Sequence, residues 1–255
     1  MRCVVQGPKG APGNVDAVTT DAPAAHAAKP LWRRITGSAW FHLIAAFVVA
    51  GLLLTFVAKP YLVPSASMES TLQPGDRLLV NRLAYVGSEP ATGDIIVFDA
   101  DETWGAHATD SEVWWKAAAR WVGEVTGFGP SGPHTLVKRV IAGPGQVVEC
   151  CTASGAITVD GVALDETYLG SDFPFEAGTL DCTTVPASLR CFDAVTVPEG
   201  SYLVLGDNRT NSSDSAAQCR GVPDADPSCW RWATRADVVG KVSVILWPIG
   251  RWGAL

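Results

Sequence analysis

The sequence predicts a mainly β protein that is preceded by one membrane-spanning helix. Two observations support this prediction. An apolar run from 39 to 58 contains His42 as its only ionisable residue and is long enough to cross a bilayer. Beyond it, short runs rich in β-branched and aromatic residues alternate with Gly, Pro, Asp and Asn, which is the pattern of strands separated by turns. The runs expected as strands are 77–81, 94–98, 136–141, 157–159, 201–205 and 242–247.

The composition is that of a globular protein. The chain has 255 residues, of which 47% are hydrophobic and 18% charged, and this length suits one large or two small domains. Lys and Arg number 19 against 26 Asp and Glu, so the net charge is -7. Because phosphate contacts need clustered cations, no nucleic-acid partner is expected.

Residues 1–38 differ sharply from the apolar run that follows. They are rich in Ala, Pro and Gly and poor in large apolar side chains, so they are expected to form a disordered tail. The run at 39–58 lies too deep in the chain for a cleaved secretory signal and is expected to remain as an anchor, with a buried core helix as the alternative. Three basic residues precede it: Lys29, Arg33 and Arg34. The positive-inside tendency therefore predicts a plasma-membrane protein with a cytoplasmic N-terminus and an extracytoplasmic segment 59–255.

Cysteine positions agree with this topology. Six of the seven cysteines fall in the exported part, where disulfides persist: Cys150, Cys151, Cys182, Cys191, Cys219 and Cys229. The sequence leaves their connectivity open, although two pairs are close enough to close short loops: Cys182 with Cys191 and Cys219 with Cys229. No CxxC pair and no HExxH motif occurs, so neither a metal nor another cofactor is expected.

One stretch of the exported part has a different periodicity. Across about 111–126, Trp, Val and Ala recur at helical spacing opposite charged residues. This segment is expected to form an amphipathic helix. It would lie either on the membrane surface or against the protein's own core, and the sequence leaves both open.

A small-residue segment directly after the apolar run offers a nucleophile. Ser65 and Ser67 are two residues apart, which places them on the same side of an extended chain. Serine attacks a carbonyl only when a neighbouring base takes its proton. Among the histidines only His134 could serve, but its Gly-Pro context indicates a turn, and the GxSxG nucleophile motif is absent.

Lys138 is the other candidate base, in the otherwise apolar run 136–141. A lysine that faces the interior is desolvated, and the resulting fall in its pKa lets a neutral amine accept a proton. Because side chains alternate along a strand, one of Lys138 and Arg139 faces inward and the other outward. The residues alone leave that choice open.

Five motifs occur in order along the chain: PSASM, LQPGD, GDIIVF, VKRVIAGPG and LGDNRTNSSDS. Together with the preceding apolar run they resemble the boxes of the type I signal peptidases, the bacterial leader peptidases. The resemblance covers about 40–252. It implies a membrane-bound serine endopeptidase that removes N-terminal signal peptides from exported preproteins after small residues of the Ala-x-Ala type. It implies neither a cofactor nor a metal.

The resemblance also implies the reacting groups. Ser67 would be the nucleophile and Lys138 the general base, and the reaction would pass through an acyl-enzyme. The hydroxyl of Ser65 and the backbone N–H of Ser67 would bind the oxyanion. Ser212 would hydrogen-bond and orient the lysine amine.

Supporting residues follow from the same resemblance. Asp207 would pair with Arg139, and Asp214 would belong to the same supporting turn. The chain departs from the family pattern at Ser70, where Pro is common, and at Ala216, where a basic residue is common. The first change is expected to loosen a turn, and the second to remove a partner of Asp214.

The implied substrate is the extended C-terminal part of a signal peptide. It would add as a strand beside 61–64 and the strand of Lys138, and two shallow pockets would accept small side chains. The expected lining residues are Val63, Pro64, Met68, Leu72, Leu136 and Val137. Further expected partners are the lipid bilayer and, as a candidate, the export machinery.

The domain plan implied by the resemblance is a catalytic antiparallel β core interrupted by a smaller β-rich insertion. The core comprises 59–146 and 200–255, and the insertion comprises 147–199. Two other classes fit parts of the sequence. A self-cleaving repressor-like protein shares the Ser/Lys chemistry but is soluble and carries a DNA-binding module, and an anchored β binding domain would carry a degenerate site.

Overall fold

A computed structural model of the chain describes residues 3, 7, 10, 32, 36–105 and 135–255. Most of the expected 1–38 tail and the whole of the expected 111–126 helix lie outside these residues. The chain divides into two compact units, Met1–Ala45 and Ala46–Leu255. Both β-sheets belong to the second unit.

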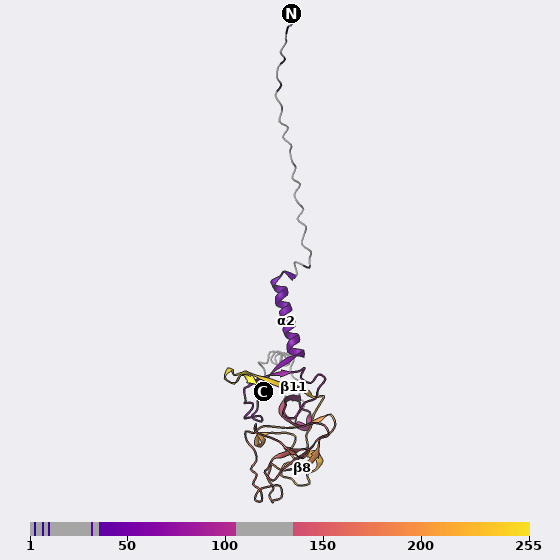
Figure 1. Cartoon of the computed structure of the whole chain (residues 1–255), viewed down its shortest axis with the longest axis vertical. Helices are drawn as coiled ribbons and strands as arrows, with labels where there is room; N and C mark the ends of the chain where they lie inside the picture. Colours follow the sequence, from indigo (N-terminus) through magenta and orange to yellow (C-terminus); the bar gives the residue numbers. More distant parts are fainter. Residues whose placement is uncertain (1–2, 4–6, 8–9, 11–31, 33–35, 106–134) are drawn as a thin grey trace, which may run out of the picture. The chain divides into compact units, whose positions relative to one another are not determined.

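Helix α2 (Ala39–Phe56) accounts for most of the apolar run (Figure 1). In the part of the chain that the structure describes, it is the single helix long and apolar enough to span a membrane. It ends at Phe56, two residues before the end of the apolar run, and strand β1 begins at Ala58. Proline explains the change, because Pro60 disfavours helical backbone at Lys59 and cannot continue a helix itself.

The larger sheet has the strand order β1-β2-β11-β3-β4-β9-β10, with β12 paired to β11, and neighbouring strands are antiparallel. Its strands are β1 (Ala58–Leu62), β2 (Arg77–Asn81), β3 (Ile95–Asp99), β4 (Thr135–Ala142), β9 (Ser201–Leu205), β10 (Ala233–Thr234), β11 (Val238–Trp247) and β12 (Gly253–Ala254). The smaller sheet has the order β7-β6-β5-β8. Its strands are β5 (Val147–Cys150), β6 (Ile157–Val159), β7 (Val162–Ala163) and β8 (Phe192–Thr196).

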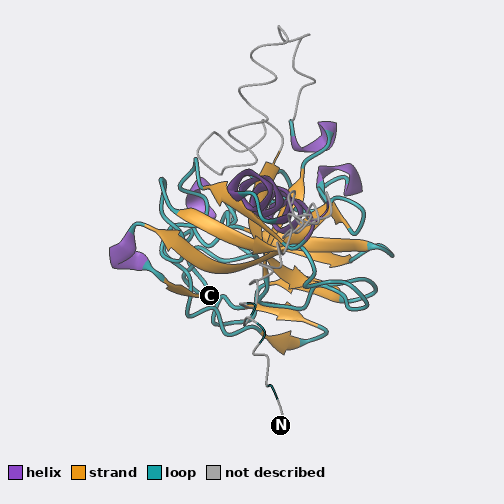
Figure 2. Ribbon diagram, turned by 90° about the horizontal axis from the view of Figure 1, so that it is seen from above, coloured by secondary structure: helices purple, strands orange, loops and turns teal. Residues whose placement is uncertain are grey.

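Loops and short 3-10 helices surround the strands (Figure 2). The 3-10 helices are η1 (Glu102–Trp104), η2 (Arg209–Asn211), η3 (Pro227–Cys229) and η4 (Ile249–Arg251). The predicted fold class, a mainly β antiparallel protein with one apolar helix, is confirmed.

Both faces of the larger sheet are covered, and β3 shows how its sequence achieves this. Ile95 and Val97 belong to one hydrophobic cluster, whereas Ile96 and Phe98 belong to another. Because successive side chains of a strand point to opposite faces, a continuous apolar run fills two cores at once. This central strand pairs with β4 and so fixes the strand that carries Lys138, whose register partner is Ile96.

A third cluster joins the two sheets. Ile141 and Leu205, from β4 and β9, pack in the same cluster as Val148 and Phe192, from β5 and β8. The smaller sheet therefore packs against β4 and β9 of the larger sheet through apolar side chains.

The structure has three disulfides, which join Cys150 with Cys151, Cys182 with Cys191, and Cys219 with Cys229. Both short-loop pairs form. Cys3 is free and exposed.

An ion pair with a buried carboxylate ties the C-terminal η4 to the turn that follows the Ser67 segment. Arg251 donates from Nε to Asp76 at 3.0 Å and from Nη2 to the Thr71 carbonyl at 3.0 Å, and Asp76 is 1% exposed. Replacing Arg251 by Met leaves a buried carboxylate without its cation, so we expect Arg251→Met to lower the free energy of unfolding by about 2 kcal/mol. Urea denaturation of the detergent-solubilised chain measures the change.

Arg235→Met is the matched control. Its partner Glu89 is 65% exposed, so the loss of that pair is expected to cost no more than about 1 kcal/mol. Equal losses for the two variants would contradict the structural role given to Asp76.

Candidate active site

A pocket lies between the segment that follows β1 and the first half of β4. It is lined by Tyr61, Leu62, Val63, Pro64, Ser65, Ser67, Met68, Thr135, Leu136, Val137 and Lys138. Five of the six expected lining residues are among these. The exception is Leu72, which is fully buried in the hydrophobic cluster that also contains Met68 and is not among the residues that line the pocket.

Ser67 and Lys138 meet in this pocket. Lys138 Nζ lies 2.8 Å from Ser67 Oγ, and the two residues are 3% and 7% exposed respectively. The inward-facing member of the Lys138–Arg139 pair is therefore the lysine. His134, the rival base, lies outside the described residues.

Burial changes the acidity of this lysine. Desolvation lowers the pKa of Lys138 to about 8, because an ammonium loses its hydration in the protein interior. The carboxylates of Asp214 and Asp207 oppose this shift through their negative charge. At a pH slightly above neutral, a substantial fraction of the amine is uncharged and can accept a proton from a hydroxyl 2.8 Å away.

The backbone around Ser67 is held from the loop after β9. The N–H of Asn208 donates to the Ser67 carbonyl at 3.1 Å. Gly206 approaches the same carbonyl so closely that a Cβ on this residue would lie 2.5 Å from the oxygen. The Ser67 N–H makes no hydrogen bond to another described residue, and the exposed Ser65 places its Oγ 3.3 Å from Ser67 Oγ. Two hydrogen-bond donors thus flank the nucleophile candidate.

Arg139 and Asp207 form the ion pair that was expected. Arg139 Nε and Nη2 donate to the two oxygens of Asp207 at 2.8 and 2.6 Å, a bidentate arrangement that fixes both side chains. Thr71 adds a hydrogen bond to Asp207 at 2.6 Å, and the guanidinium lies 3.9 Å from the centre of the Tyr168 ring. The Ser67 segment is therefore tied to β4 and to the loop after β9 through Thr71.

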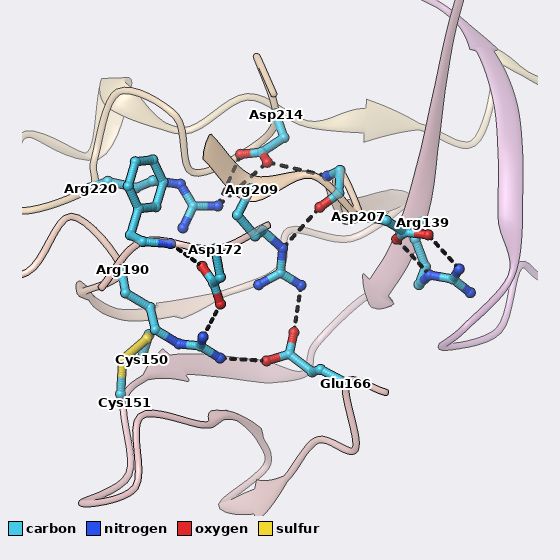
Figure 3. Close-up of polar contacts among 12 residues, drawn as sticks. Arg139, Cys150, Cys151, Glu166, Asp172, Arg190, Asp207, Arg209, Asp214 and Arg220 are labelled. Atoms are coloured by element: carbon cyan, nitrogen blue, oxygen red, sulfur yellow. Dashed lines mark hydrogen bonds and ion pairs between the residues drawn. A yellow bond between two sulfur atoms is a disulfide. The ribbon is translucent and has the colours of Figure 1, made fainter. Parts of the chain in front are cut away.

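Asp214 has a cationic partner after all. Although Ala216 stands where the family commonly has a basic residue, Arg220 reaches back and places Nη2 3.2 Å from Asp214 Oδ1 (Figure 3). Both side chains are almost completely buried. The expectation that Asp214 had lost its partner was wrong, because Arg220 follows Cys219, and the Cys219–Cys229 disulfide folds this segment beside the turn.

Ser212 is in place but does not make the expected hydrogen bond. Its Oγ is buried and has no partner among the described residues. It packs against Gly206, where an added Cβ would lie 2.3 Å from the hydroxyl oxygen. In this structure the side chain therefore contributes packing around the Ser67 loop, and the Lys138 amine is held by Ser67.

Ser70 adopts a conformation that Pro cannot. Its φ is 85°, whereas a proline ring fixes φ near about -65°. The Ser70 hydroxyl donates to the Tyr168 carbonyl, so the substitution comes with an added tether. This hydrogen bond holds the turn at the position where the family commonly has Pro.

An ion-pair network behind the site was not predicted from the sequence. Arg209 is 1% exposed, donates from Nε to the Gly206 carbonyl at 2.9 Å and pairs with Glu166 at 2.5 Å. Glu166 also pairs with Arg190, which in turn binds Asp172 (Figure 3). Because Gly206 touches the Ser67 loop, this network supports the site from the inserted segment.

Among the described residues, one group has the chemical types and the spacing of a metal site. The sulfur atoms of Cys151, Cys182 and Cys191 lie within 4.8 Å of one another. All three belong to disulfides, and metals bind the thiolate form of cysteine. The pocket that contains Ser67 and Lys138 has no such group.

Comparisons with known proteins define the class of this chain. The family described as "Signal peptidase, peptidase S26" matches residues 37–247. The chain is 38% identical over 255 residues to a protein named Signal peptidase I from Mycobacterium tuberculosis, an alignment that covers 95% of this chain and 81% of that protein. It is 36% identical over 234 residues to a Probable signal peptidase I from Mycobacterium leprae, with 85% and 78% covered.

Among solved structures, a signal peptidase I from Enterococcus faecalis is similar at 24% identity. That match covers 61% of this chain and 98% of the other, with a TM-score of 0.32.

These matches place the chain among the serine endopeptidases. The chain belongs to the signal peptidase family, peptidase S26. It therefore acts on preproteins that carry signal peptides and removes those peptides by serine-protease chemistry. The resemblance recognised in the sequence is confirmed.

The close approach of Gly206 to the nucleophile loop makes a specific prediction. In Gly206→Ala, the new Cβ displaces the Ser67 carbonyl or the Ser212 side chain, since both would lie within 2.5 Å of it. We expect the rate of signal-peptide cleavage to fall by about 100-fold or more, because shifts of about 1 Å at a nucleophile have effects of that size. Initial rates on a preprotein measure the loss.

Gly250→Ala is the control, since nothing lies within 4 Å of its added Cβ. Unchanged activity in Gly206→Ala would show that the Ser67 loop tolerates movement and would contradict this account.

Proposed function

We propose that this chain is a membrane-anchored signal peptidase that cuts after small residues of the Ala-x-Ala type through a Ser67/Lys138 dyad. The observation that supports this most strongly is the 2.8 Å contact between a buried lysine amine and a serine hydroxyl inside the pocket. Serine needs a base to attack, and a desolvated lysine is a base near neutral pH.

The reaction begins with proton transfer from Ser67 to Lys138. As Ser67 Oγ attacks the scissile carbonyl, the neutral amine takes the hydroxyl proton, and the resulting ammonium then gives a proton to the leaving amine of the mature protein. The signal peptide remains as an ester on Ser67. Lys138 next removes a proton from water, and the water oxygen attacks the ester carbonyl. As the signal peptide leaves, the Lys138 ammonium returns a proton to Ser67 Oγ and both groups are regenerated.

Two donors would stabilise the oxyanion of each tetrahedral intermediate. The N–H of Ser67 has no acceptor among the described residues, and the hydroxyl of Ser65 lies beside the nucleophile. Donors that are positioned before the reaction stabilise a developing negative charge without reorganisation. Asp207 with Arg139 and Asp214 with Arg220 would act as positioning pairs, because they fix the loops on which the reacting groups stand.

The substrate would bind as an extended strand along the first half of β4. From Thr135 to Lys138 this strand pairs with β3, and its pairing with β9 begins only at Arg139. Backbone groups on that side of β4 can therefore bind a peptide, while Val63, Leu136 and Val137 line the pocket with apolar surface. A narrow apolar pocket favours small side chains such as that of Ala.

Helix α2 would anchor the enzyme, with the N-terminus in the cytoplasm and residues 59–255 on the extracytoplasmic side. Its 18 residues carry no charge, and the basic residues of the chain before it lie on the expected cytoplasmic side. Within the exported part, the catalytic core would be the larger sheet and the insertion 147–199 would be the smaller one. Protease protection of the intact chain in oriented vesicles tests the orientation.

The dyad is tested by mutating both members in the membrane-bound chain. We expect Ser67→Ala and Lys138→Ala each to reduce cleavage of an Ala-x-Ala preprotein by about four orders of magnitude or more, since the nucleophile and its base act as a unit. Ser65→Ala is expected to lose about 100-fold, the effect of one oxyanion donor. Product formation is followed by gel or mass spectrometry, and a preprotein with large residues in place of both alanines tests the specificity.

Matched controls exist for both residue types. Ser213 is an exposed serine of the same loop as Ser212. Lys241 lies on β11 and pairs with Asp94. Ser213→Ala and Lys241→Ala are therefore expected to cleave the preprotein at the wild-type rate. Full activity in Ser67→Ala or in Lys138→Ala would remove the dyad from the mechanism.

The pKa of Lys138 predicts the pH dependence of the reaction. Below about 8 the amine is protonated and cannot act as a base, so kcat/KM is expected to rise with pH and to reach half its maximum near pH 8. The Asp214 charge raises the pKa of Lys138, so Asp214→Asn is expected to move this midpoint to lower pH. Asp160→Asn, which changes an exposed carboxylate in the turn between β6 and β7, is expected to leave it in place. A midpoint that stays the same in Asp214→Asn would contradict this electrostatic assignment.

A further inference from the structure

Four cysteines of the inserted segment form one cluster of sulfur atoms. Cys150 ends strand β5, and Cys191 directly precedes β8, which pairs with β5. The sulfur atoms of Cys151, Cys182 and Cys191 lie within 4.8 Å of one another, although they belong to two different disulfides. Cys182 Sγ also lies 3.6 Å from the Cys150 carbonyl oxygen. A sulfur of one disulfide can therefore reach a sulfur of the other with little movement.

The cluster is open to an attacking thiol from outside. Cys182 is exposed and Cys151 half-buried, whereas Cys150 and Cys191 are buried. A pocket lined by Cys150, Cys182 and Cys191, together with Phe192, Val222 and Pro223, leads to these sulfurs. An incoming thiolate therefore meets Cys182 first.

Loop lengths favour a different pairing of the same four cysteines. The Cys150–Cys151 bond joins neighbours in the sequence and the Cys182–Cys191 bond closes a short loop, so the two bonds restrict the unfolded chain little. A bond from either neighbour to Cys182 or Cys191 would close a much longer loop. In the chain-entropy description, the longer loop gives the greater stabilisation of the folded state.

Ion pairs within the insertion hold the loop that carries Cys191. Arg190 directly precedes Cys191 and pairs with Glu166 and with Asp172 (Figure 3). Neither ion pair involves a sulfur atom. Both can therefore persist while sulfur partners change, and they keep the reacting sulfurs close together.

We propose that Cys150, Cys151, Cys182 and Cys191 form a thiol–disulfide exchange site. A thiol of the glutathione type would act there as catalyst. It would convert the two present bonds into two bonds that join the end of β5 to the 182–191 loop. This inference is independent of the role proposed for Ser67 and Lys138.

The exchange balances without any net oxidation or reduction. The external thiolate attacks Cys182 Sγ, forms a mixed disulfide and releases the Cys191 thiolate. The Cys191 thiolate attacks Cys151 Sγ, forms the first cross-link and releases the Cys150 thiolate. The Cys150 thiolate attacks Cys182 Sγ, forms the second cross-link and releases the external thiolate unchanged.

Peptide mapping after cleavage at glutamate tests this site directly. Cleavage after Glu149, Glu166, Glu176 and Glu199 places Cys150 and Cys151 on the peptide 150–166, and Cys182 and Cys191 on the peptide 177–199. With the present pairing each disulfide lies within one peptide, so the two peptides are separate. After exchange, two disulfides join them into one species. Mass spectrometry distinguishes the two results without any mutation.

The experiment uses the full chain, purified in detergent without thiols. The protein is incubated with a mixture of reduced and oxidised glutathione, alkylated, and digested at acidic pH, where exchange stops. We expect the joined species to increase with time to become the major form. A joined species that is already present in the untreated protein supports the proposal equally. It would show that the bonds between the end of β5 and the 182–191 loop have formed before purification.

Two controls make a negative result decisive. The peptide 200–255 carries Cys219 and Cys229, whose sulfurs are not part of the cluster, and it is expected to remain separate throughout. The double variant Cys182→Ser with Cys191→Ser removes the partners of the first pair and is expected to yield no joined species. If the wild-type peptides 150–166 and 177–199 stay separate before and after glutathione treatment, the proposal is overturned.

Discussion

The burial of one lysine amine against one serine hydroxyl is the constraint on which the rest of the site depends. Lys138 can be a base near neutral pH only if the protein interior removes its hydration, and this residue is 3% exposed on a strand that is held in place by β3. Two buried carboxylates oppose the effect. Their pairing with arginines limits this opposition, since Arg139 and Arg220 each neutralise one of them. The fold therefore provides desolvation and balanced charge at the same place.

Much of the fold could be predicted because several strands of both sheets carry local signals. The runs 77–81, 157–159 and 201–205 match strands to the residue, since each is apolar and bounded by turn formers. Strand β1 was not predicted because Pro60 argues against a strand. Proline is nevertheless tolerated in an edge strand, and β1 is an edge strand of the larger sheet. Strand β8 was missed because only Phe192 of its five residues is fully buried, so its sequence lacks a clear apolar alternation.

Site residues that lie inside the five ordered motifs could be predicted. A residue outside the motifs that takes part in the site could not. Ser67, Lys138 and the Arg139–Asp207 pair follow from ordered motifs, and the structure brings their side chains together. The Asp214–Arg220 pair could not be read from the sequence, because it depends on how a disulfide folds the segment after the motif.

Titration of the Lys138 amine by NMR measures directly whether burial makes it a base near neutral pH. The full chain is labelled with 15N and 13C lysine in detergent, and the resonance is assigned by its loss in Lys138→Ala. We expect a titration midpoint near pH 8, well below the ordinary lysine value of about 10.4. A midpoint at the ordinary value would show a solvated ammonium at this position and would exclude Lys138 as the base.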